Sequence, residues 1–395
     1  MEYNFNRRID RRGTYSAKYN NAAHGVPEDA LPMWVADMDF ETPPCVSEAL
    51  KKRVDHGIYG YSEPDAKYFE IVQNWFKDRF GWKTESEWIQ IAPGVVNAIY
   101  IAVRALSEPG DGVLIQQPVY YPFVSAVKNN KRELLINKLI YEGLRYEIDF
   151  EDFENKAKRA KIFILCSPHN PVGRVWTEGE LRRIGEICLK HGVYVISDEI
   201  HADFVYPGNR HHVFAGLSEA FADIAVTCTA PSKTFNLAGI PHSNIFISNK
   251  NIRDKFNCEY EISGIGMNGV MGIIACGAAY ENGGGWLDAL IGYLRGNVDC
   301  LRGFLQNRIP GIKLVEPEGT YLAWLDCAAL GLPPDKLEDL ILNGAKVWLS
   351  RGEAFGAGGE GFRRMNLGCP RSVLQEALER IEKSVLRYAA IRTDC

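Results

Sequence analysis

The 395-residue sequence predicts an α/β protein with a large, mostly parallel sheet domain and a smaller α+β domain. Its length suggests two or three domains at ~150 residues each. The middle of the chain alternates short β-rich runs with helical patterns, which is typical of a parallel sheet covered on both faces. The last third instead places several strands before a long helix, which is typical of an α+β domain.

Six apolar runs in the middle of the chain are expected to form the large sheet. Their high content of Ile, Val and Leu favours strands that are buried on both faces. The runs are Gly112–Gln116, Leu134–Leu139, Ile162–Cys166, Tyr194–Ser197, Ile224–Cys228 and Asn244–Ser248. Two segments between them predict helices: Val95 to Leu106 is apolar on one face, and Thr177 to His191 opens with a Thr/Glu capping pattern.

The C-terminal third predicts the smaller domain. Ile312 to Asp326 resembles two strands around a Pro-Glu-Gly turn, further strands are expected at Val347–Ser350 and Phe362–Leu367, and a helix from Ser372 to Ala390 closes the chain. The glycines at 283–285 mark a boundary. We therefore expect an N-terminal segment (1–44) that joins the small domain, a large domain (45–285) and the small domain (286–395).

Composition and charge exclude several classes of protein. The 45 Lys and Arg against 50 Asp and Glu give a net charge of −5, which argues against nucleic-acid or acidic-membrane partners. No apolar run is long enough to span a membrane, and the first residues lack the apolar segment of a secretory signal. The ten cysteines lie at least 18 positions apart and form no metal-binding pattern. We expect a cytoplasmic protein with reduced thiols and no structural metal.

The most informative lysine is Lys233, in the segment Thr229 to Gly239. It follows a predicted buried strand, so it is expected just beyond the carboxyl end, where open α/β sheets bind ligands. A lysine there with hydroxyl residues on either side suits a Schiff base to an aldehyde cofactor whose phosphate the hydroxyls bind. Taken alone, a Ser-Lys-Thr tripeptide is better explained as a solvated surface loop.

Three other strand ends carry residues that favour the cofactor interpretation. Asp198 suits a pyridinium nitrogen, Asn170 suits a phenolic oxygen, and Tyr120 offers an aromatic face for stacking on a ring. Each also has an ordinary explanation: Asp198 as a helix cap, Asn170 in a turn with Pro171, and the tyrosine as core. Their common placement at the carboxyl ends of strands indicates one site.

This set resembles that of the pyridoxal-phosphate enzymes of the aspartate aminotransferase fold (fold type I), over nearly the whole chain. Two motifs, Leu31–Phe40 (LPMWVADMDF) and Pro231–Asn236 (PSKTFN), closely resemble those of the MalY/PatB group within the class I/II aminotransferase superfamily. That group contains the cystathionine β-lyases and related carbon–sulfur lyases, including cystalysin. The resemblance therefore implies pyridoxal 5'-phosphate as cofactor.

The resemblance also implies which residues bind this cofactor: Tyr61, Val95, Val96, Tyr120, Asn170, Asp198, His201, Ser232 and Lys233. Lys233 would carry the covalent link, Asp198 would pair with the pyridine nitrogen and Tyr120 would stack on the ring; these three are the expected catalytic residues. Asn170 and His201 would lie near the phenolic oxygen. The backbone N–H groups of Val95 and Val96, at a helix N-terminus, and the Ser232 hydroxyl would hold the phosphate.

On the substrate side, the resemblance implies that Arg364 forks onto the α-carboxylate. Tyr121 follows the stacked tyrosine in the sequence, so it is expected either to contact the substrate and assist proton transfer or to have a packing role, and Ala36 is a further expected substrate contact. The adjacent Arg363 is the alternative anchor if the register is shifted by one, and is otherwise expected to be a surface charge. Tyr61 would reach the phosphate of the neighbouring subunit's cofactor, which predicts a homodimer with shared active sites.

Two positions depart from ordinary aminotransferases of this fold. Those enzymes carry a serine three residues before the lysine and an arginine eight residues after it, both on the phosphate. This sequence has Ala230 and Pro241 instead. The phosphate would therefore depend more on helix-terminus N–H groups, Ser232 and tyrosine, as fits the lyase branch.

The implied activity is β-elimination from L-cystathionine or an L-cysteine-type amino acid, giving a thiol, pyruvate and ammonia. An aminotransferase is the first alternative, because it shares every cofactor residue and differs only in the fate of the carbanion. A regulatory protein that binds a transcription activator is the second, because a relative in the family has that role.

Overall fold

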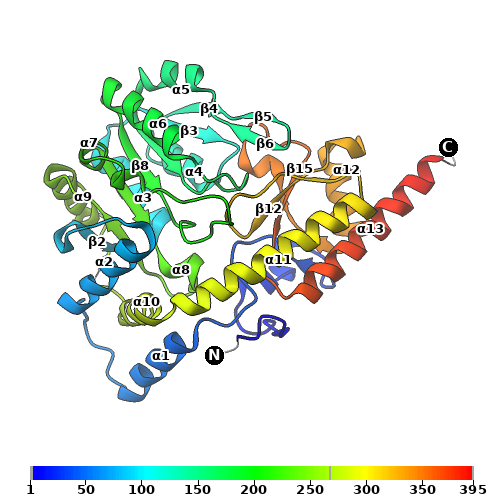
Figure 1. The fold of residues 1–395 in the computed structure, drawn as a ribbon, viewed down its shortest axis with the longest axis horizontal. Coiled ribbons are helices and arrows are strands. Elements are labelled where there is room, and N and C mark those ends of the chain that lie inside the picture. Colours follow the sequence, from blue (N-terminus) through cyan, green and yellow to red (C-terminus); the bar gives the residue numbers. More distant parts are fainter. Residues whose placement is uncertain (1–2, 267, 394–395) are drawn as a thin grey trace.

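In the computed structural model, residues 3–266 and 268–393 are described, and within these ranges the largest sheet has seven strands in the order β2-β10-β9-β8-β7-β3-β4 (Figure 1). β10 runs antiparallel to both of its neighbours, β2 and β9, and the other pairings in this sheet are parallel, so the sheet is mostly parallel, as predicted. The strands are β2 (Ile89–Ala92), β3 (Gly112–Gln117), β4 (Glu133–Lys138), β7 (Ala160–Cys166), β8 (Tyr194–Asp198), β9 (Ala225–Thr229) and β10 (Ser243–Phe246).

Most side chains of the central strands are buried, because apolar layers cover both faces of the sheet. Phe163 and Val195 belong to one hydrophobic cluster, and the next residues along each strand, Ile164 and Ile196, belong to another. This alternation follows from the two-residue period of a strand. The helices around the sheet are α2 (Ala66–Phe80), α3 (Val95–Leu106), α4 (Pro122–Asn129), α5 (Phe150–Ala157), α6 (Glu178–His191), α7 (Glu219–Asp223), α8 (Pro231–Thr234), α9 (Lys250–Ile262) and α10 (Val270–Asn282).

A smaller antiparallel sheet forms from the C-terminal third. Its order among the described residues is β11-β12-β15-β14, with β11 (Lys313–Leu314), β12 (Leu322–Asp326), β14 (Ser350–Arg351) and β15 (Phe362–Asn366). The long helix α11 (Gly284–Arg308) extends from the large sheet to this region and packs against α13 (Arg371–Thr393), as Figure 1 shows in yellow and red. Helix α12 (Pro334–Glu338) completes this part of the molecule.

The N-terminal segment reaches the C-terminal third through a short parallel pair. Strand β1 (Leu31–Pro32) pairs with β13 (Val347–Trp348), and the chain then enters α1 (Pro44–His56), which packs on α10. A two-stranded hairpin, β5 (Ile140–Glu142) and β6 (Arg145–Glu147), lies beyond β4. The β1–β13 pair brings the segment after Pro32 next to both sheets.

Most predicted elements are confirmed, with ends shifted by one to three residues. The helix from Val95 to Leu106 is confirmed, and Thr177 forms the predicted capping box with Glu180. The prediction of a single strand over Val347–Ser350 is wrong: β13 pairs with β1, whereas β14 pairs with β15, so the segment changes sheets at Leu349. The short strand β2 was not predicted.

From the sequence, we expect no disulfides, no structural metal and no membrane span. The nine cysteines described there are all free, and no group of His, Cys, Asp and Glu in the same ranges is arranged to hold a metal ion. Among the helices of the described part, none is long and apolar enough to cross a membrane.

Candidate active site

A cavity of about 580 Å³ lies at the carboxyl ends of β3, β7, β8 and β9. Ten predicted cofactor or substrate residues line it together with Lys233: Ala36, Val95, Val96, Tyr120, Tyr121, Asn170, Asp198, His201, Ser232 and Arg364. A larger cavity of about 900 Å³ beside α2 contains none of them. The smaller cavity is therefore the candidate site, because ligands of open α/β sheets bind where the strands end.

Lys233 reaches this cavity from α8, which begins directly after β9. Pro231 starts the helix after the extended residue Ala230, so the lysine stands one turn beyond the strand end. Its Nζ atom donates to the carbonyl oxygen of Ala36 at 2.7 Å. Burial lowers the pKa of Lys233 to about 8, although the nearby Asp37 acts in the opposite direction. Near pH 8 much of the amine is uncharged, which suits both nucleophilic attack and proton removal.

Asp198 ends β8 and presents a buried carboxylate to the cavity. It accepts a hydrogen bond from the backbone N–H of Ile200 at 3.1 Å, and burial raises its pKa to about 7. A buried carboxylate in this state is stabilised by a cationic donor beside it. The ring N–H of pyridoxal phosphate is such a donor, so Asp198 fits the role expected from the sequence.

His201 is buried one turn beyond Asp198. Its Nδ1 atom has no hydrogen-bond partner within the described residues, and its ring packs edge-on against Tyr321. Burial, together with the charges of Lys233 and Arg364, lowers the pKa of His201 to about 3, so the ring is neutral at physiological pH. An unpartnered ring nitrogen in a cavity wall fits a hydrogen bond to a bound group.

The N-terminus of α3 provides an anion site at one end of the cavity. Its N-cap residue, Gly94, has no side chain to cap the first N–H groups, so those of Val95 and Val96 remain open to a phosphate. Ser232 also lines the cavity. His242, which was not predicted, lies in the same wall; its Nε2 is 2.5 Å from the Tyr68 hydroxyl, and burial lowers its pKa to about 4.

Arg364 enters the cavity from β15 of the small sheet. Its Nη1 donates to Asn170 Oδ1 at 3.0 Å, and its Nη2 donates to the carbonyl oxygen of Trp34 at 2.8 Å and to Ser350 Oγ at 3.2 Å. Nε is buried without a partner, and no acidic side chain in the described residues forms an ion pair with this guanidinium. Burial lowers its pKa to about 10, so the group stays cationic at neutral pH. A buried guanidinium without an acidic partner fits the binding of a carboxylate anion.

Arg363 points to the opposite face of the same strand. It is fully buried and forms ion pairs with Glu338 at 3.2 Å and Glu353 at 3.5 Å. The expectation of a surface charge is therefore wrong. The two arginines diverge because successive side chains of a strand alternate between faces.

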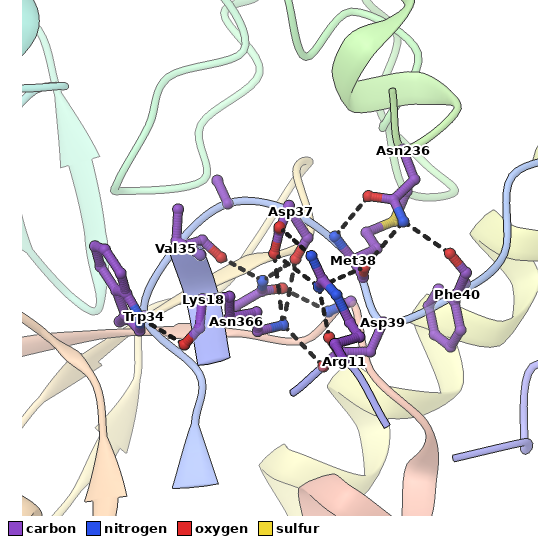
Figure 2. A network of polar contacts seen from close by, with 12 residues as sticks. Arg11, Lys18, Trp34, Val35, Asp37, Met38, Asp39, Phe40, Asn236 and Asn366 are labelled. Atoms are coloured by element: carbon purple, nitrogen blue, oxygen red, sulfur yellow. Dashed lines mark hydrogen bonds and ion pairs between the residues drawn. The ribbon is translucent and has the colours of Figure 1, made fainter. Parts of the chain in front are cut away.

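The first three residues of the segment 34–40 line the cavity, and the segment is fixed by side chains from both sheet regions (Figure 2). Asn236, three residues after Lys233, donates to the carbonyl oxygens of Met38 at 2.9 Å and Phe40 at 2.7 Å, and accepts from the Met38 N–H at 2.9 Å. Asn366 donates to the carbonyl oxygens of Val35 and Asp37, both at 2.6 Å.

A cluster of charged side chains also fixes the segment 34–40. Lys18, which is almost fully buried, pairs with Asp39 at 2.8 Å, and Arg11 bridges Asp37 at 2.7 Å and Asp39 at 2.9 Å (Figure 2). Charge-assisted bonds of this kind are stronger than neutral ones, particularly where water is excluded. The carbonyl oxygen of Ala36 is thereby held beside Lys233.

The predicted tyrosines are placed differently from one another. Tyr120 lines the cavity, and burial raises its pKa to about 12, so it stays protonated. Tyr121 lies at the rim and is half-exposed. Tyr61 is 93% exposed and does not line the cavity of its own chain.

Sequence reasoning missed several residues of the cavity wall, chiefly Trp34, Trp348, Ser350 and His242. Trp34 stands inside the motif 31–40, which was the available signal. Trp348 and Ser350 reach the site only because β13 pairs with β1 and β14 pairs with β15. No local pattern in the sequence marks that pairing.

The sequence is similar to those of known proteins over most of its length. The model of the family "Aminotransferase class I and II" matches residues 29–381. Cystathionine beta-lyase PatB of Bacillus subtilis is 47% identical over 386 residues, covering 97% of this chain and 100% of that protein. Protein MalY of Escherichia coli is 33% identical over 381 residues, covering 95% and 97% of the two chains.

Solved structures agree with these relationships. Cystalysin from Treponema denticola, which contains a pyridoxal 5'-phosphate cofactor, superposes with a TM-score of 0.95 at 41% identity, covering 98% of this chain and 100% of that chain. The PLP-bound C-S lyase from Staphylococcus hominis superposes with a TM-score of 0.92 at 34% identity, covering 98% of each. The chain therefore belongs to the aminotransferase class I and II family, and within it to the group of PatB, MalY and cystalysin.

Proposed function

We propose that this protein is a pyridoxal-phosphate-dependent carbon–sulfur β-lyase that cleaves L-cystathionine or L-cysteine-type amino acids to a thiol, pyruvate and ammonia. The observation that carries the proposal is one cavity in which the Lys233 amine, the Asp198 carboxylate and an Arg364 guanidinium without an acidic partner in the described residues converge. The identity of 47% to a cystathionine β-lyase supports it.

The cavity residues hold the cofactor at both of its ends. Val95, Val96 and Ser232 would bind the phosphate, and Asp198 would keep the pyridine nitrogen protonated. Asn170 and His201 would face the phenolic oxygen, and Tyr120 would cover the ring. When bound through Lys233, pyridoxal 5'-phosphate supplies an electron sink that acidifies the Cα–H of an attached amino acid.

The chain's own groups then perform the proton transfers. Arg364 fixes the substrate carboxylate, so the Cα–H is presented in one orientation. The Lys233 amine, uncharged above pH ~8, removes the Cα proton and lies next to the Ala36 carbonyl oxygen that orients it. The Cβ–S bond then breaks, and the sulfur takes up the proton that Lys233 removed and leaves as a thiol. Hydrolysis of the remaining three-carbon fragment by one water yields pyruvate and ammonia.

An aminotransferase would use the same residues. It is the second candidate, because the family that matches the chain is that of the class I and II aminotransferases. Incubation of the purified protein with L-cystathionine distinguishes the two. A lyase releases equal amounts of pyruvate, ammonia and thiol without a keto-acid acceptor. Release of a keto acid that retains the sulfur, only when an acceptor is added, would overturn the lyase assignment. Lys233→Ala is the inactive control.

We also propose a cytoplasmic homodimer in which Tyr61 completes the partner's site. Ile58, Tyr59 and Tyr61 are 66%, 55% and 93% exposed on one loop, an apolar surface that suits burial against a second copy. Mixing inactive Tyr61→Phe and Lys233→Ala chains should restore part of the activity. In a mixed dimer, one of the two sites has Lys233 from one chain and Tyr61 from the other. An active monomer in sedimentation at assay concentration would contradict the shared site.

A further inference from the structure

One part of the cavity wall is not used by the cofactor or by the substrate carboxylate. It lies around Arg364 and is formed by Trp34, Glu338, Trp348, Leu349, Arg351 and Ala354. When the carboxylate of a substrate is bound at Arg364, the groups beyond its Cβ lie only a short distance from Arg364. This wall is therefore where the sulfur substituent, the part that leaves as the thiol, has room.

Two indole rings dominate this wall. The rings of Trp34 and Trp348 are stacked, with centroids 4.4 Å apart and planes 21° apart, and His24 packs against both at 5.2 Å. The indole N–H of Trp34 donates to the carbonyl oxygen of Lys18 at 3.3 Å. The backbone carbonyl oxygen of Trp34 accepts a hydrogen bond from Arg364. The aromatic surface is thus fixed in position relative to the carboxylate anchor.

The charged groups of the same wall already have partners. Glu338 is 3.2 Å from Arg363, and Arg351 is 3.0 Å from Asp335 and 3.5 Å from Glu353. A substituent that ends in its own ammonium and carboxylate groups would have to displace one of these ion pairs or enter without a counter-charge. An apolar substituent meets neither obstacle and covers the indole surface.

We propose that Trp34 and Trp348 form the subsite for the sulfur substituent, and that it selects apolar, above all aromatic, S-substituted cysteines over substrates with a charged distal end such as L-cystathionine. This inference rests on the proposed β-lyase function and names its substrate class. Trp34 and Trp348 act as specificity-determining residues, because they contact the part of the substrate that varies.

The test measures kcat/KM for pyruvate release from S-benzyl-L-cysteine, S-methyl-L-cysteine and L-cystathionine. The parent should prefer S-benzyl-L-cysteine over L-cystathionine. In Trp348→Leu and in Trp34→Leu, the value for S-benzyl-L-cysteine should fall about tenfold while that for S-methyl-L-cysteine stays within about threefold. Each substrate is compared between variant and parent, so differences in thiol leaving ability cancel.

A control variant separates a subsite role from a general loss of packing. Trp82→Leu removes an indole that is 8% exposed, close to the 9% of Trp348, but packs against Phe76 and Phe246 outside the cavity, so it should not alter the substrate ratio.

Two results would overturn the subsite: a parent that prefers L-cystathionine, or tryptophan variants that change all substrates equally or none. Using both tryptophan variants keeps the test valid if one of them fails to fold. Failure of the β-lyase proposal itself is distinguishable, because the parent would then release no pyruvate from any of the three substrates.

Discussion

Arg364 donates from Nη1 to Oδ1 of Asn170 at 3.0 Å, and this hydrogen bond joins β15 of the small sheet to the end of β7 in the large sheet. The two residues are 194 positions apart in the chain. The proposed substrate anchor is therefore positioned by the same amide that faces the proposed cofactor. With these proposed roles, this one contact would link binding of the carboxylate to orientation of the cofactor.

Arg364→Lys should raise KM about tenfold and lower kcat, because lysine keeps the charge but loses the planar fork that holds a carboxylate at two points. Steady-state kinetics of pyruvate release measure both constants. Arg363→Met is the matched control: it should leave KM unchanged but lower the free energy of unfolding by about 3–5 kcal/mol, because Glu338 and Glu353 lose their partner. A raised KM in Arg363→Met together with an unchanged KM in Arg364→Lys would show that Arg363 is the anchor.

Asp198→Asn should lower turnover at least tenfold, about 1.4 kcal/mol of barrier, because a neutral amide does not hold a pyridine nitrogen in its protonated form. The cofactor-free variant should be as stable as the parent or more stable, since burial raises the pKa of this carboxyl group and its ionisation opposes folding. Thermal unfolding of the cofactor-free proteins tests the second part. Turnover within about threefold of the parent would contradict the assigned role.

Cofactor capture should titrate with an apparent pKa near 8. Burial disfavours the charged form of Lys233, which lowers its pKa from the ordinary 10.5 to about 8, and only the uncharged amine attacks an aldehyde. The rate at which cofactor-free protein binds pyridoxal 5'-phosphate covalently should rise with pH up to about 8 and then level off. Stopped-flow absorbance measures this rate, and a rise that continues to pH 10 would mean that the lysine is not shifted.

Asn236→Ala should loosen the segment 34–40, because its side chain makes three hydrogen bonds to Met38 and Phe40. Unfolding free energy should fall by about 1–3 kcal/mol, the range for leaving buried backbone groups unpaired. kcat/KM should fall about tenfold as the Ala36 carbonyl oxygen loses its fixed position beside Lys233. Asn307→Ala, which removes one hydrogen bond from the exposed side of α11, should change neither quantity.

The sequence by itself determined which residues are present at the strand ends. The apolar runs before Tyr120, Asn170, Asp198 and Lys233 specify buried parallel strands, and parallel strands bring their carboxyl ends to one edge. This geometry is enough to predict that the four side chains share a cavity. The motif 31–40 added the family resemblance, although not the path of that segment through the structure. The domain boundaries at residues 44 and 285 stay a prediction.

Only the tertiary structure decided how the small sheet completes the site. The adjacent arginines, Arg363 and Arg364, are equivalent in composition and charge, and the pairing of β15 with β12 and β14 decides which one faces the cavity. Trp34 and Trp348 meet because β1 and β13 pair across more than 300 positions of sequence. Such contacts depend on long-range packing and backbone hydrogen bonds, and a local pattern of residues does not encode them.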